Sequence, residues 1–101
     1  MNQIERISKM EKKFDQASSA ILKLSEALDN YNATIEAIDE VSDYYGSDEW
    51  KKDYADDEAR LLPTELKRGV LSEDGIWNMI TNDHELMVQM LETITERLRK
   101  R

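Results

Sequence analysis

Apolar residues in the first half of the chain recur at alternating steps of three and four positions. The series runs through Ile7, Met10, Phe14, Ala17, Ile21, Leu24, Leu28, Tyr31, Ile35 and Ile38. This spacing puts all of them on one side of an α-helix and is the heptad pattern of coiled coils. Asn2 and Glu5 precede it at the spacing of a capping box. We therefore predict a helix over about residues 3–44, roughly 60 Å long.

A second, shorter helix is predicted over about residues 48–60. Ser47 suits an N-cap, and Asp48 and Glu49 follow it in the first turn, where acidic side chains complement the helix dipole. Trp50 is expected to face inward. A helix of this length is not stable alone in water, so we expect it to dock on the first helix.

Residues 61–71 are the predicted connection to a third helix. This segment contains Pro63, the one proline of the chain, and Gly69. Its apolar side chains are Leu62, Leu66, Val70 and Leu71. A free linker would carry fewer apolar residues, so we expect this segment to lie against the helices.

The third helix is predicted over about residues 73–99, with Ser72 as its N-cap and with Leu71 and Ile76 as a hydrophobic staple. Its inward-facing positions are Trp77, Ile80, His84, Met87, Leu91, Ile94 and Leu98, and a second stripe holds Ile76, Met79, Leu86 and Met90. The three helices predict an all-α fold. We expect residues 1–101 to form one domain, an elongated three-helix bundle with a long, a short and a long helix.

The negative charge of the chain is concentrated in one segment. The net charge is −8, and residues 36–58 hold ten acidic and two basic residues, so this segment alone accounts for the total. Such a surface repels nucleic acid and anionic membranes, and we expect neither as a direct partner. The chain has no cysteine and no apolar run long enough to span a membrane, from which we expect a cytoplasmic protein.

Two stretches resemble a known family. The more specific one contains Leu62-Pro63 and continues from Leu66 to Asp74 as LKRGVLSED; the other is Tyr44-Tyr45-Gly46-Ser47 before Glu49-Trp50. The chain resembles, over nearly its whole length, the small bacterial proteins of domain of unknown function family 4298. Gly75 departs from the family's pattern, which usually has a better helix former there. The resemblance supports the helix boundaries and implies no activity, cofactor or catalytic residue.

The residues do not form a recognisable catalytic constellation. His84 is the only histidine, and its place in the apolar stripe favours a core or interface histidine over a metal ligand or general base. No HExxH motif, glycine-rich phosphate loop or nucleophile elbow is present. We expect no enzyme activity, no cofactor and no metal.

Two charged clusters have a structural and a functional interpretation. The acids Asp53, Asp56, Asp57 and Glu58 lack the spacing of a calcium loop and point to different sides of a helix, which favours a solvated face over a cation site. Lys67-Arg68 could bind a phosphate or an acidic partner. Pairing with acids of the first or second helix is the expected alternative.

The candidate partner surface combines the acidic segment, its aromatic residues and the second stripe of the third helix. Its members are Tyr44, Tyr45, Asp53, Asp56, Asp57, Met79, Leu86 and Met90. Aromatic and methionine side chains are common at protein interfaces. In the structural alternative, the rings simply hold the second helix on the end of the first, which is our expectation for Trp50.

The sequence therefore leaves three functional hypotheses. The first is a non-enzymatic helical interaction or scaffold module, whose partner is another protein or a second copy of the chain. The second is an acidic decoy that occupies a basic nucleic-acid-binding protein. The third is a metal-dependent enzyme that uses His84 and nearby carboxylates.

Overall fold

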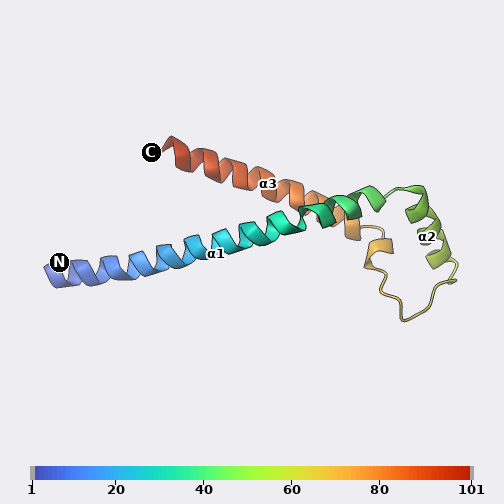
Figure 1. Ribbon diagram of the computed structural model, residues 1–101, viewed down its shortest axis with the longest axis horizontal. Coiled ribbons are helices and arrows are strands. Elements are labelled where there is room, and N and C mark those ends of the chain that lie inside the picture. The colour runs from blue at the N-terminus through green and yellow to red at the C-terminus, as the bar shows by residue number, and fades with distance from the viewer. Residues whose placement is uncertain (1, 101) are drawn as a thin grey trace. The chain divides into compact units, whose positions relative to one another are not determined.

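The computed structural model describes residues 2–100 and shows an all-α protein (Figure 1). Three α-helices and one 3₁₀ helix follow one another along the chain. They are α1 (Gln3–Tyr44), α2 (Asp48–Glu58), η1 (Gly69–Leu71) and α3 (Gly75–Arg99). No strand occurs among the described residues. The predicted all-α class, with long first and third helices and a short second one, is confirmed.

The chain divides into two compact units, Met1–Ala37 and Ile38–Arg101, and the boundary falls inside α1. The first unit is therefore one helical segment. The second contains the end of α1, together with α2, η1 and α3. The single domain expected over residues 1–101 stays a prediction, and its two terminal residues lie outside the described residues.

The start of α1 is capped as the sequence predicts. Asn2 Oδ1 accepts a hydrogen bond from the backbone N of Glu5 at 2.8 Å, and Asn2 Nδ2 donates to Glu5 Oε1 at 3.2 Å. This occupies one of the four backbone N–H groups that a helix leaves unpaired at its start. None of the 42 described residues of α1 is buried.

The turn between α1 and α2 is built by Gly46 and Ser47. Gly46 has a φ of 81°, which glycine adopts without the steric cost of a Cβ. The hydroxyl of Ser47 donates to the carbonyl of Tyr44 at 2.6 Å and accepts from the backbone N of Trp50 at 3.1 Å. The predicted N-cap at Ser47 is confirmed.

The helix α2 ends at Glu58, two residues before the predicted end at residue 60. Arg60 has a φ of 59°, its backbone N donates to Asp57 O at 3.0 Å, and Leu61 N donates to Asp56 O at 3.0 Å. This is the Schellman arrangement, in which the left-handed residue is usually glycine. The sequence does not reveal this end because an arginine holds the position.

The start of α3 corrects the predicted N-cap. α3 begins at Gly75 after Asp74, two residues later than predicted. The hydroxyl of Ser72 instead donates to Gly69 O at 2.8 Å and accepts from Gly75 N at 3.0 Å, so it joins η1 to α3. A Cβ at Gly75 would lie 2.5 Å from Ser72 Oγ and 2.6 Å from Gly69 O. The close approach of η1 therefore requires glycine here.

Leu71 and Ile76 flank this junction and are the two buried residues among those described, with 6% and 3% exposure. Both were predicted as the staple pair. The predicted inward-facing positions of α3 are covered less than predicted. Leu91 is 64% exposed and His84 is exposed, so His84 is not a core residue. α3 has 25 residues and η1 has three, so η1 covers only the start of α3.

Candidate functional site

An aromatic cluster joins α2 to its neighbours. The rings of Tyr45 and Trp50 meet edge to face with centroids 5.0 Å apart, and Trp50 stacks on Tyr54 at 5.2 Å. The indole Nε1 of Trp50 donates to the carbonyl of Val70 at 2.9 Å. Trp50 therefore links α2 to η1 as well as to the end of α1. Its bond to Val70 could not be predicted, because it joins positions twenty residues apart.

Tyr44, the last residue of α1, is bound to α2. Its hydroxyl donates to Asp53 Oδ2 at 2.6 Å. The hydrogen bond to this carboxylate, with partial burial and the nearby negative charge, raises the pKa of Tyr44 to about 12. Both residues belong to the predicted partner surface, and the structure brings them together as partners of each other.

The other two acids of the predicted surface also have internal partners. Asp56 accepts from Lys52 Nζ at 3.0 Å, and this bond raises the pKa of Lys52. Asp57 accepts from Arg68 Nη1 at 2.5 Å. The expected pairing of the Lys67-Arg68 segment with an acid of the second helix is confirmed for Arg68.

Arg68 also fixes the connecting segment. Its Nη2 donates to the carbonyl of Pro63, and its Nε donates to Leu66 O at 3.3 Å. One guanidinium group therefore binds α2 and two backbone carbonyls, which uses the fork of N–H donors that distinguishes arginine from lysine. At this position, a structural role explains every contact.

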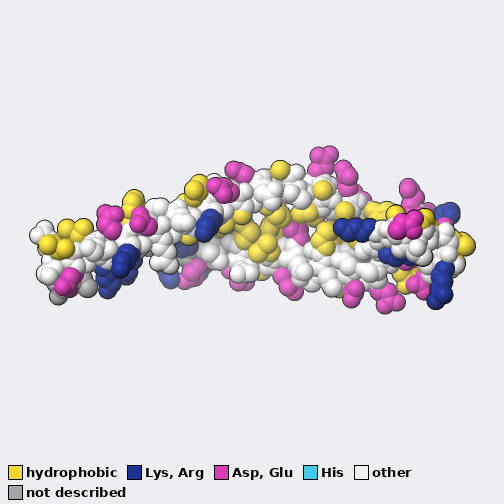
Figure 2. All heavy atoms as spheres, turned by 90° about the horizontal axis from the view of Figure 1, so that it is seen from below, with side chains coloured by type: hydrophobic (Ala, Val, Ile, Leu, Met, Phe, Trp, Pro, Cys, Tyr) yellow, Lys and Arg dark blue, Asp and Glu magenta, His cyan; other side chains and the backbone are white. Residues whose placement is uncertain are grey.

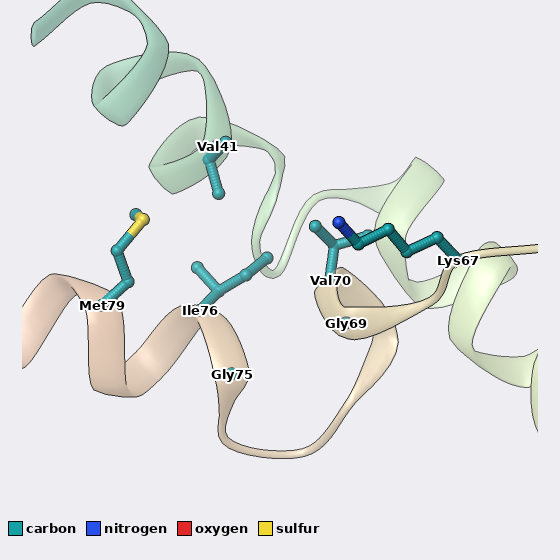
Figure 3. Close-up of a pocket in the computed structure, with 7 residues that line it drawn as sticks. All are labelled: Val41, Lys67, Gly69, Val70, Gly75, Ile76 and Met79. Carbon is teal, nitrogen blue, oxygen red and sulfur yellow. The ribbon is translucent and has the colours of Figure 1, made fainter. Parts of the chain in front are cut away.

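An open cleft of about 480 Å³ lies between the end of α1, η1 and the start of α3 (Figure 3). Its lining residues are Val41, Lys67, Gly69, Val70, Gly75, Ile76 and Met79. Val41 points toward Ile76 and Met79, and the Lys67 side chain extends past Val70 (Figure 3). Met79 is the one member of the predicted partner surface here. The sequence signal for Val41 and Val70 was only their apolar character.

The remaining predicted residues lie on α3. Leu86 is exposed and Met90 is half-buried. Neither lines the cleft formed by η1 and the ends of α1 and α3, and neither is near the paired acids in sequence. The predicted partner surface is thus divided between the α2 contacts, the cleft and the face of α3.

Nine of the exposed large hydrophobic residues lie on α1, more than on any other described element. We define the α1 stripe by the heptad positions of the first unit: Ile7, Met10, Phe14, Ala17, Ile21, Leu24, Leu28, Tyr31 and Ile35. Phe14, Ile21 and Leu24 are 64–69% exposed, and Ile35 is 40% exposed. Figure 2 shows hydrophobic side chains at the surface among charged groups. These positions are predicted to be buried, and within the first unit they are not.

Among residues 2–100, no group of three or more His, Cys, Asp or Glu side chains is placed to hold a metal ion. No described helix combines the length and the apolar character needed to cross a membrane.

The family comparison agrees with the resemblance seen in the sequence. Residues 7–93 match the family described as Domain of unknown function (DUF4298). The chain belongs to this family. No curated protein and no solved structure matches it. The matched range takes in the whole of the α1 stripe, the whole of α2 and the junction of η1 with α3.

Proposed function

We propose that this DUF4298 protein is a non-enzymatic helical module that binds a protein partner, either another protein or a second copy of the chain, through the α1 stripe. The observation that carries the proposal is the exposure of a continuous heptad series on a long helix. Isolated helices are marginal in water and are mostly stabilised by packing an apolar face. A helix with such a face and no covering element in its own unit is suited to bind a partner.

The exposed apolar side chains of the α1 stripe extend along the first unit, from Ile7, which is 52% exposed, to Ile35, which is 40% exposed. A face of this length supports a partner of substantial contact area. The proposal keeps the expected bacterial, cytoplasmic setting and a coiled-coil type of contact.

The acidic decoy is the less supported alternative. Asp53, Asp56 and Asp57 each have an internal partner, so they are less available to a basic protein. A metal-dependent reaction at His84 lacks a supporting observation among the described residues.

The test is affinity capture from a bacterial lysate with a matched pair of double variants. Ile21→Glu with Leu24→Glu places two charges in the α1 stripe. Ser19→Glu with Ala33→Glu adds the same charge on the opposite side of the helix. Glutamate is a good helix former, so both variants should keep their helical content, which circular dichroism checks.

We expect the stripe variant to lose partners that the control retains after a wash at moderate salt. Apolar contacts survive such a wash, whereas exposed charge contacts are screened within about 10 Å at 0.1 M salt. Retention of every partner by the stripe variant would contradict the proposal. A partner held equally by both variants at low salt and released at moderate salt would favour the acidic decoy.

A further inference from the structure

We propose that the α1 stripe binds a second copy of this chain, with the two α1 helices antiparallel. The inference rests on the proposed function, for which it names the partner. Two independent features of α1 support it: the order of large and small side chains in the stripe, and the distribution of charge along the helix.

The stripe is complementary to its own reverse. A two-fold axis between Leu22 and Lys23 places every a position of the heptad opposite a d position of the second copy. Met10 then faces Ile35, Ala17 faces Leu28 and Ile21 faces Leu24 of the second copy. The smallest side chain of the stripe meets a large one, which is how packed layers fill space. Such a contact is isologous, so it closes as a dimer.

The charges of α1 favour the same direction. Residues 3–23 hold five basic and three acidic side chains, a net charge of +2. Residues 24–37 hold three acids and no base, a net charge of −3. Antiparallel helices bring the positive part of one copy beside the negative part of the other. At the central flanking positions, Ala20 faces Ala27 of the second copy, and Ser18 faces Ser25, so no like charges meet there.

A parallel pair would be less complementary. It would place Ala17 opposite Ala17 of the second copy, which leaves the layer underfilled, and it would bring the two negative parts together. Its one advantage is an ion pair between Arg6 and Glu11 of the second copy, which is the g-to-e contact of parallel coiled coils. An exposed ion pair of this kind is a weak contribution. Packing and charge together therefore outweigh it.

The first measurement is the mass of the full chain by sedimentation equilibrium. We expect about 23.6 kDa, twice the 11.8 kDa of one chain. The Ile21→Glu, Leu24→Glu variant should return to the mass of one chain, and the Ser19→Glu, Ala33→Glu control should remain a dimer. A wild-type mass of one chain would overturn the inference, with α3 of the same chain as the alternative cover for the stripe.

The second measurement fixes the direction of the helices. The chain has no cysteine, so each introduced thiol is the only one. In the antiparallel register, Met10→Cys lies about 37 Å from Met10→Cys of the second copy, too far for a disulfide. Met10→Cys of one copy instead lies opposite Ile35→Cys of the second copy. We expect mild oxidation to link the two variants only when they are mixed, and urea present during the oxidation to prevent the link.

The competing results separate the two proposals. A disulfide between two Met10→Cys chains, identified by mass spectrometry, would overturn the antiparallel direction. A monomeric chain that still captures another protein through the stripe would overturn the proposal that the partner is a second copy. It would leave the proposed function intact. A monomer without stripe-dependent capture would contradict both.

Discussion

The α1 stripe and the segment of residues 44–76, which we call the polar corner, differ in how sequence relates to contacts. The stripe has the most regular pattern in the chain, yet no residue of α1 is buried. The polar corner has little periodicity, yet it contains Leu71 and Ile76, the two buried residues among those described, and a series of specific hydrogen bonds. A regular apolar pattern therefore specifies a helix without specifying what covers it. An irregular segment can form defined tertiary contacts through caps, turns and single side-chain bonds.

The largest expected effect of a single substitution is at Leu71, which is 6% exposed. Leu71→Ala should lower the free energy of unfolding by about 2–5 kcal/mol, because it removes buried apolar contacts and leaves a cavity. Leu61→Ala is the matched control, since Leu61 is 71% exposed and should lose less than about 1 kcal/mol. Urea unfolding at one fixed low protein concentration measures both, because self-association would otherwise add to stability.

The same experiment at Leu24 of the α1 stripe and at Leu91 of α3 sharpens the comparison. The periodicity predicts that Leu24→Ala or Leu91→Ala costs about 2–5 kcal/mol if the apolar faces of the two helices are buried. Both side chains are 64% exposed, so in a dilute monomer each should cost less than about 1 kcal/mol. Equal losses for Leu24→Ala and Leu71→Ala under dilute conditions would remove the distinction between the two regions.

Gly75→Ala has the next largest expected effect. A Cβ there would lie 2.6 Å from the backbone carbonyl of Gly69, so η1 or α3 must shift, at a cost of about 1–3 kcal/mol. Gly69→Ala is the control, because no atom lies within 4 Å of a Cβ at that position. A Gly75→Ala protein as stable as Gly69→Ala would show that the junction is looser than the structure describes.

The elements of the fold could be predicted from the sequence because their signals are local. The heptad spacing predicted α1, Ser47 predicted the start of α2, and Leu71 with Ile76 predicted the buried pair. Each depends on residues within five positions of one another. The ends that were wrong, at Glu58 and Gly75, depend on a left-handed arginine and on a serine that bonds η1. Neither feature has a local signature.

The candidate site could be predicted only in part. Tyr44 and Asp53 were both selected, but their bond could not be derived from a nine-residue separation. Lys67, Val70 and Ile76 were not expected to line a cleft with Val41, because that depends on how the connecting segment folds back. Charge and aromatic content identify where interactions concentrate. They do not distinguish contacts within the chain from contacts with a partner.

Tyr44→Phe should lower the stability of the polar corner by about 1 kcal/mol at neutral pH, because it removes the hydrogen bond to Asp53. The folded pKa of Tyr44, about 12, lies above the usual 10.0. The stabilisation is therefore complete below pH 10 and is lost as the pH rises toward 12. The difference in unfolding free energy between wild type and Tyr44→Phe should accordingly narrow in that range.

Tyr45→Phe provides the control for this pH dependence. Its ring contact with Trp50 does not involve the hydroxyl and remains in the variant. We expect the gap between wild type and Tyr45→Phe to stay constant through the same pH range. A gap for Tyr44→Phe that is equally constant would argue against the bond to Asp53.

Arg60→Gly has the smallest expected effect and the opposite sign. A left-handed conformation costs a non-glycine residue about 1–2 kcal/mol, and glycine loses about 0.5–1 kcal/mol through its greater freedom in the unfolded chain. The net result should be a gain of about 0.5–1 kcal/mol, measured by urea unfolding. Ala59→Gly, one position earlier at a φ of −79°, should instead destabilise, since it gains no relief of strain. If both glycines changed stability in the same direction, Arg60 would not hold the left-handed position that ends α2. The stability of the polar corner would then depend less on its turn geometry than on its side-chain hydrogen bonds.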